Sequence, residues 1–139
     1  MSKNKRMYSK RWHARNLFKD ARSKNNRLCF TGIFYTFNGS MKLLIDRTFA
    51  IEKTIHDKDF YLLTTGLALE ESYFRIIKDT FQKYIDCLRV GGNRFVDYVL
   101  GFKTGNKDDI EKTDVLEKAY NMAKEIKINE QKFNSLFFT

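Results

Sequence analysis

The sequence predicts a single α+β domain behind a basic N-terminal arm. The chain has 139 residues, of which 42% are hydrophobic and 15% aromatic, and this is enough apolar surface to build one core. Two apolar runs separated by Asn-Gly predict a long β-hairpin. Later apolar stripes at helical spacing predict three helices packed on the sheet. These observations favour one layer of strands covered by helices.

The predicted hairpin has strands over 28–37 and 41–51, joined by a turn at 38–40. Asn and Gly tolerate positive φ, so Asn-Gly is typical of a two-residue hairpin turn. In the second strand, apolar and polar residues alternate with the two-residue period of a half-buried strand. The same residues fit one face of a helix over 41–55, which stays open as the alternative for this segment. For the chain as a whole, an all-α fold is the alternative. A third strand over 60–65 would extend the sheet.

Three helices complete the predicted domain. The longest covers 67–90, has a broad apolar stripe, and ends at the glycine pair that follows it. A short helix covers 94–102, with Phe95, Val99 and Phe102 on one side. The last covers 110–128, and Asp114 followed by Glu117 suggests a new helix start inside it.

The excess of positive over negative charge is confined to the first 27 residues of the chain. Residues 1–27 contain five Lys and five Arg against one acid, Asp20, whereas residues 28–139 contain 16 basic and 16 acidic residues. The net charge of +9 therefore belongs entirely to the arm. A block of one sign indicates an interaction segment. We accordingly divide the chain into a basic aromatic arm, 1–27, and a neutral α+β domain, 28–139.

The arm has helical spacing over 7–23, with one apolar side that fits against the domain. Tyr8 and Trp12 lie on the other side among cations, an arrangement suited to stacking on bases while basic groups hold phosphates. The predicted nucleic-acid-binding residues are Lys3, Lys5, Arg6, Tyr8, Lys10, Arg11, Trp12, Arg15, Lys19, Arg22, Lys24 and Arg27. Arg94, behind Gly91-Gly92 and ahead of a predicted helix, is a secondary phosphate contact.

No residue pattern predicts catalysis, a metal site or a cofactor, so we expect no enzyme activity. His56, Asp57 and Asp59 fall in a predicted loop and read as a hydrogen-bonded turn rather than as metal ligands. Cys29 and Cys87 are far apart and lack metal-ligand spacing. No apolar run is long enough to span a bilayer, so no membrane partner is expected.

These features predict a non-enzymatic, sequence-nonspecific nucleic-acid-binding accessory protein of the cytoplasm, or of the host cytoplasm if the chain is viral. RNA is slightly favoured over DNA, because aromatic platforms need unstacked bases. The alternative is a small inhibitor or assembly factor of phage or mobile-element type, which would bind a larger nucleic-acid-processing protein complex. A structural component of a virion or ribosome is a further alternative.

Overall fold

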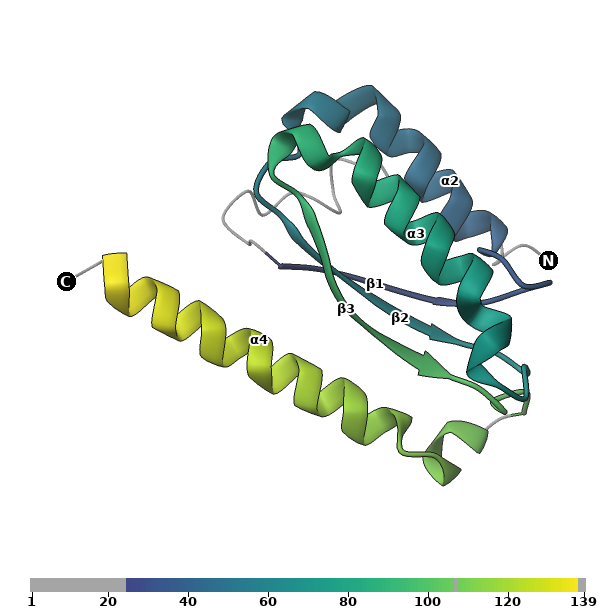
Figure 1. Ribbon diagram of the computed structural model, residues 1–139. Helices are drawn as coiled ribbons and strands as arrows, with labels where there is room; N and C mark the ends of the chain where they lie inside the picture. Colours follow the sequence, from purple (N-terminus) through teal and green to yellow (C-terminus); the bar gives the residue numbers. More distant parts are fainter. Residues whose placement is uncertain (1–24, 107, 138–139) are drawn as a thin grey trace, which may run out of the picture.

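The computed structural model describes residues 25–106 and 108–137, in which strands and helices alternate along the chain (Figure 1). The order is β1 (Asn25–Thr31), α2 (Gly39–Thr48), β2 (Asp59–Thr65), α3 (Arg75–Cys87), β3 (Arg94–Gly101) and α4 (Val115–Phe137), with short 3₁₀ turns at Phe49–Thr54, Glu71–Phe74, Arg89–Gly91 and Asp109–Lys112. The strands form one parallel sheet in the order β1-β2-β3. The helices α2 and α3 each connect the end of one strand to the start of the next, and α4 follows the last strand.

The central strand β2 is covered on both faces. Phe60, Tyr61 and Leu62 are all buried, and such a continuous apolar run is typical of a parallel strand between two layers. Phe60 and Leu62 belong to the core beneath α2 and α3, together with Met41, Ile77 and Phe81.

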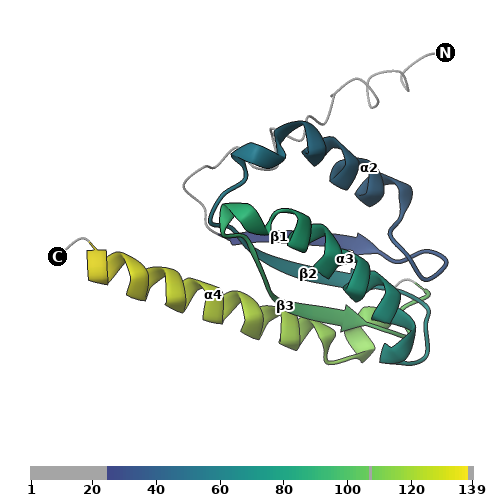
Figure 2. The same cartoon turned by 45° about the horizontal axis from the view of Figure 1, so that its top comes forward.

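The opposite face of the sheet packs against α4. Tyr61 and Val99 contact the buried stripe of this helix, Val115, Met122 and Ile126. Figures 1 and 2 show α2 and α3 on one side of the sheet and α4 on the other. In both views α4 runs back beneath the sheet toward the edge from which the strands start.

The predicted β-hairpin is wrong, and so is an all-α fold for the whole chain. The alternative for this segment, a helix over 41–55, is confirmed as α2 and the 3₁₀ turn that follows it. Residues 39–48 form the helix α2, and β1 pairs in parallel with β2 rather than with this segment. Asn38 explains the difference, because its side-chain Oδ1 accepts a hydrogen bond from the Met41 backbone N–H at 2.8 Å. Its Nδ2 donates to the Thr31 carbonyl at the end of β1. Asn38 is thus the N-cap of a helix, not the first residue of a turn.

The predicted short helix over 94–102 is also wrong, because this segment is the strand β3. The register between β2 and β3 shifts after Phe60, so that Phe60 pairs with Phe95 but Tyr61 pairs with Asp97. This β-bulge at Val96 displaces the alternation of side chains along the strand by one residue. As a result, the apolar residues Phe95 and Val99 are four apart in the sequence, which is also the spacing of residues on one face of a helix.

The other predicted elements are found with shifted boundaries. The strand over 60–65 is confirmed as β2. The helix over 67–90 is shorter: it begins as a 3₁₀ turn at Glu71 and continues as α3. The last helix begins after Asp114 rather than at residue 110, and it continues to Phe137. Among the described residues, no helix is long and apolar enough to cross a membrane.

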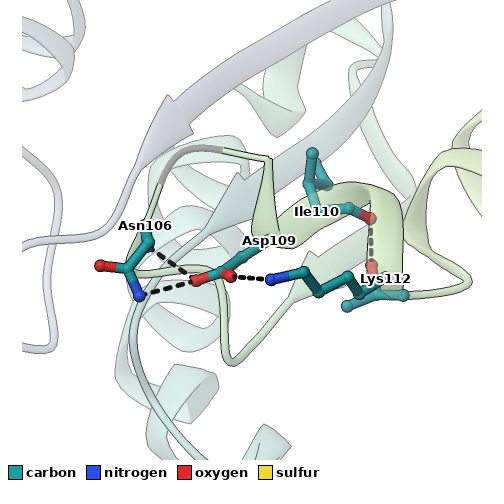
Figure 3. A network of polar contacts seen from close by, with 5 residues as sticks. Asn106, Asp109, Ile110 and Lys112 are labelled. Atoms are coloured by element: carbon teal, nitrogen blue, oxygen red, sulfur yellow. Dashed lines mark hydrogen bonds and ion pairs between the residues drawn. The ribbon is translucent and has the colours of Figure 1, made fainter.

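A polar network closes the loop between β3 and α4 (Figure 3). The Asp109 carboxylate accepts hydrogen bonds from the backbone N–H and the side-chain amide of Asn106, at 2.8 and 3.1 Å. Lys112 Nζ donates to the same carboxylate at 3.0 Å. These contacts lower the pKa of Asp109, chiefly through the backbone hydrogen bond from Asn106. The network fixes the turn that directs α4 under the sheet.

Candidate functional site

Most of the predicted nucleic-acid-binding residues lie outside the described part of the chain. These are Lys3, Lys5, Arg6, Tyr8, Lys10, Arg11, Trp12, Arg15, Lys19, Arg22 and Lys24. Arg27 and Arg94 are described, and both lie near the edge of the sheet from which the strands start. We call this the amino edge, and the opposite one, where the strands end, the carboxyl edge.

Three residues form one row across the amino edge. Asn25 of β1 is in register with Asp59 of β2, and Asp59 is in register with Arg94 of β3. Neighbouring strands lie about 4.8 Å apart, so the backbones of Asn25 and Arg94 are about 10 Å apart. The basic arm joins the sheet at Asn25. Its junction therefore lies close to the residue predicted to be a second phosphate contact.

Arg94 is held in place by a two-point ion pair. Its Nε and a terminal N–H group donate to the two carboxylate oxygens of Asp59, at 2.9 and 3.0 Å. The Asp59 side chain is 11% exposed and that of Arg94 is 63% exposed. A guanidinium has five N–H groups, and this geometry leaves one side of it facing solvent. Arg94 does not precede a helix as predicted, and its contact with phosphate stays a prediction.

The glycine pair before Arg94 serves packing at this edge. A Cβ on Gly91 would come within 2.4 Å of the Ile55 carbonyl oxygen, and Gly92 has a φ of +76°. Asn93 is buried, and its amide donates to the carbonyls of Ile55 and Leu88, both at 2.7 Å. Its Oδ1 accepts from the Lys58 N–H at 3.0 Å. The segment is therefore a structural junction that sets the start of β3.

Arg27 lies two residues inside β1, and its side chain is exposed. Leu28 belongs to the core beneath α2 and α3, so Arg27 and Cys29 point to the other face of the sheet. Partial burial raises the pKa of the Cys29 thiol, and the positive charge of Arg27 partly opposes this. Because the Cys29 thiol is exposed, its rate of alkylation can report on binding at the neighbouring Arg27, a predicted phosphate contact.

Elsewhere in the described residues, many basic groups have acidic partners of their own. The ion pairs on helices and turns are Lys42–Asp46, Lys83–Asp86, Lys112–Asp109 and Lys118–Asp114. Such exposed pairs add little stability, but they leave little local excess of positive charge.

Asp59 is engaged by Arg94, and no cluster of three His, Cys, Asp or Glu side chains suited to a metal ion lies within residues 25–106 and 108–137.

A cavity of about 390 Å³ lies at the carboxyl edge, between the loops that follow β1 and β2. It is lined by Gly32, Phe34, Tyr35, Gly66, Leu67, Ala68, Leu69, Tyr73, Phe74 and Ile77. We call these residues the carboxyl-edge pocket. In open parallel sheets, ligands bind beyond the carboxyl ends of the strands. The sequence does not predict this pocket, because a strand over 28–37 leaves no loop after residue 31 to form its wall.

Comparison with known proteins supports the fold only. No protein-family model matches the chain, and no curated protein sequence matches it. Among solved structures, the fold is similar to "The Structure of Trp Repressor Binding Protein from Bacillus subtilis", with a TM-score of 0.67 and 16% sequence identity. The similarity covers 78% of this chain and 68% of that one. At this level of identity, what the two chains share is the arrangement of strands and helices.

Proposed function

We propose that the protein binds nucleic acid through its basic arm, without sequence preference and without catalysis. The observation that carries the proposal is the separation of charge: ten basic residues and one acid in residues 1–27, and equal numbers of both in the remainder. Nucleic-acid phosphates attract such a segment, and the release of condensed counterions drives binding. The domain provides a neutral support for the arm.

The geometry of the amino edge supports this proposal in one respect. The arm joins β1 at Asn25, in the same row as Arg94, and Arg27 follows on the exposed face of β1. A phosphate backbone held by the arm would therefore meet Arg27 at the end of the arm, within β1, and Arg94 on the domain. Arg94 is already ordered by Asp59, so its contribution would need little loss of side-chain freedom.

RNA is the preferred ligand in this proposal, and the cytoplasm is the proposed compartment. Tyr8 and Trp12 lie among the arm's cations in sequence, and aromatic side chains stack on bases that are not already paired and stacked. Single-stranded or looped RNA offers such bases. Duplex DNA would bind through its phosphates alone, and we expect its affinity to be lower at equal salt.

The test is a salt titration of binding, measured by fluorescence anisotropy with labelled single-stranded RNA and with duplex DNA. If six arm cations contact phosphates, the slope of log K against log salt is about −4 for a single strand, so the Kd rises about 300-fold between about 50 and 200 mM salt. An affinity that stays constant over this range would refute the proposal. A shuffled RNA sequence should bind equally well.

A further inference from the structure

We propose that the carboxyl-edge pocket binds a planar aromatic molecule that carries no negative charge. This site lies at the opposite end of the strands from the arm junction, and the inference does not depend on nucleic-acid binding.

The pocket is a concave site of the size that small ligands use. Its volume of about 390 Å³ falls in the range of about 300 to 1,000 Å³ that is typical of such sites. Gly32 and Gly66 are the first residues after β1 and β2, and their N–H groups continue the sheet by donating to the Thr65 and Gly101 carbonyls, both at 2.8 Å. These hydrogen bonds fix both glycines to the end of the sheet. The lining residues come from three segments, 32–35, 66–69 and 73–77.

The side chains around the cavity are aromatic or aliphatic. Tyr35 and Tyr73 approach each other with ring centroids 5.6 Å apart and planes tilted by 35°. Leu67 and Leu69 are 71% and 65% exposed, so large apolar groups face water at the rim. A flat ring inserted here would remove this surface from water and contact aromatic faces, and both effects stabilise a complex.

The turn that carries two of these rings has an uncommon backbone. Phe34 and Tyr35 have φ values of +48° and +65°, and reciprocal hydrogen bonds between Ile33 and Thr36, both 3.1 Å, close the turn. Asn and Gly normally occupy such positions, because bulky residues are strained there. Strain of this kind collects at binding sites, where it presents particular side chains. Here it presents Phe34 at the mouth of the pocket, 93% exposed.

Charges around the pocket argue against an anionic ligand. None of the lining residues is basic. At the start of α2, the Met41 N–H that could bind a phosphate already donates to Asn38. Beside the lining residues Leu69 and Tyr73 are the two carboxylates of Glu70 and Glu71, which accept hydrogen bonds from Ser72 and Tyr98. A basic residue, Lys103, also borders the lining, and its backbone N–H donates to the Ala68 carbonyl at 2.8 Å. A phosphorylated or sulfonated ring is therefore disfavoured, and an uncharged or cationic ring is favoured.

The test uses two fluorescent dyes with the same ring system, uncharged N-phenyl-1-naphthylamine and its sulfonated form, 8-anilino-1-naphthalenesulfonate. Both are titrated into the full chain and into Tyr73→Ala and Leu69→Ser. The matched controls are Tyr120→Ala and Leu116→Ser, which remove exposed side chains of the same kind from α4. Urea midpoints establish that each variant is folded. Only binding that is lost in the pocket variants counts, because the arm can attract the sulfonate.

The expected result is that the uncharged dye binds and that its affinity falls about tenfold in each pocket variant but not in the controls. The sulfonated dye should show no component that these variants remove. Three results would overturn the proposal: no binding of the uncharged dye, equal loss in the control variants, or an equally strong pocket component for the sulfonated dye. Sedimentation velocity tests whether a second copy of the chain occupies the pocket instead. A dimer that dissociates in the pocket variants would assign this surface to self-association and would also overturn the proposal.

Discussion

Replacing Asn93 with Ala should destabilise the domain by about 3 kcal/mol. The buried side chain makes three hydrogen bonds, two to the carbonyls of Ile55 and Leu88 at 2.7 Å and one from the Lys58 N–H at 3.0 Å. Each such bond contributes about 1 kcal/mol net, and buried groups that lose a partner add to the cost. The bonds join the segment before β2, the end of α3 and the start of β3, so their loss should loosen the amino edge.

Equilibrium unfolding in urea measures this effect. With a slope near 1.5 kcal/mol/M, the midpoint should fall by about 2 M at an unchanged slope. Asn106→Ala is the matched control, because its amide makes one exposed bond to Asp109, and it should cost less than about 0.5 kcal/mol. Asn93→Asp keeps the size of the side chain but turns a carboxylate toward two carbonyl oxygens. If Asn93→Asp were neutral, or Asn93→Ala cost less than about 1 kcal/mol, the junction would not depend on these bonds.

Three further predictions concern single side chains. Thr64 is buried, and its hydroxyl has no hydrogen-bond partner among the described residues, so Thr64→Val should raise the free energy of unfolding by about 1 kcal/mol; a lower urea midpoint would contradict this. Hydrogen bonds lower the pKa of Asp109, so its stabilising contribution is present at neutral pH and is lost as the pH falls through the lowered pKa. Asp109→Asn should therefore flatten the acid limb of the stability curve, and an unchanged limb would be evidence against the network. Bound RNA should slow the alkylation of Cys29, beside Arg27, more than that of Cys87 on α3, as read by mass spectrometry; equal protection of both thiols would argue against contact at Arg27.

The central strand and the two longer helices could be predicted from the sequence because their signals are local. Residues 60–65 form an apolar run bounded by a polar segment and a glycine, and β2 is found there. The stripe of α3 is also local, since Ile77, Phe81 and Ile85 repeat every four residues and are all buried. In these segments, burial on the folded chain follows the pattern that is visible along it.

The predictions for α2 and β3 failed because the same local sequence pattern is compatible with two different structures. Asn-Gly begins hairpin turns, but Asn is also a preferred N-cap, and Asn38 has the second role. The choice depends on whether β1 pairs with the next segment or with β2, and a parallel pairing with β2 is a long-range contact. The bulge in β3 is of the same kind, because only the partner strand shows that Val96 is an extra residue.

The carboxyl-edge pocket lay beyond sequence reasoning for a related reason. Its walls come from the loop after β1 and the loop after β2, which meet only because those strands are parallel neighbours. The turn at Phe34 and Tyr35 also lacks the Gly or Asn that would have marked it in the sequence. The excess of basic residues in the arm, by contrast, is a count and needs no fold.

The most direct test of the account compares two variants with the same net charge. In one, the ten basic residues of 1–27 become Gln; in the other, ten exposed basic residues of the domain become Gln, namely Lys42, Arg47, Lys53, Arg75, Lys83, Lys103, Lys112, Lys118, Lys124 and Lys127. RNA affinity is then measured by anisotropy at low salt. The account predicts that the arm variant loses more than about 100-fold in affinity, together with its salt dependence, while the domain variant stays within about tenfold of the natural chain. Equal losses in the two variants would show that total charge, rather than the arm, controls binding and would contradict the account.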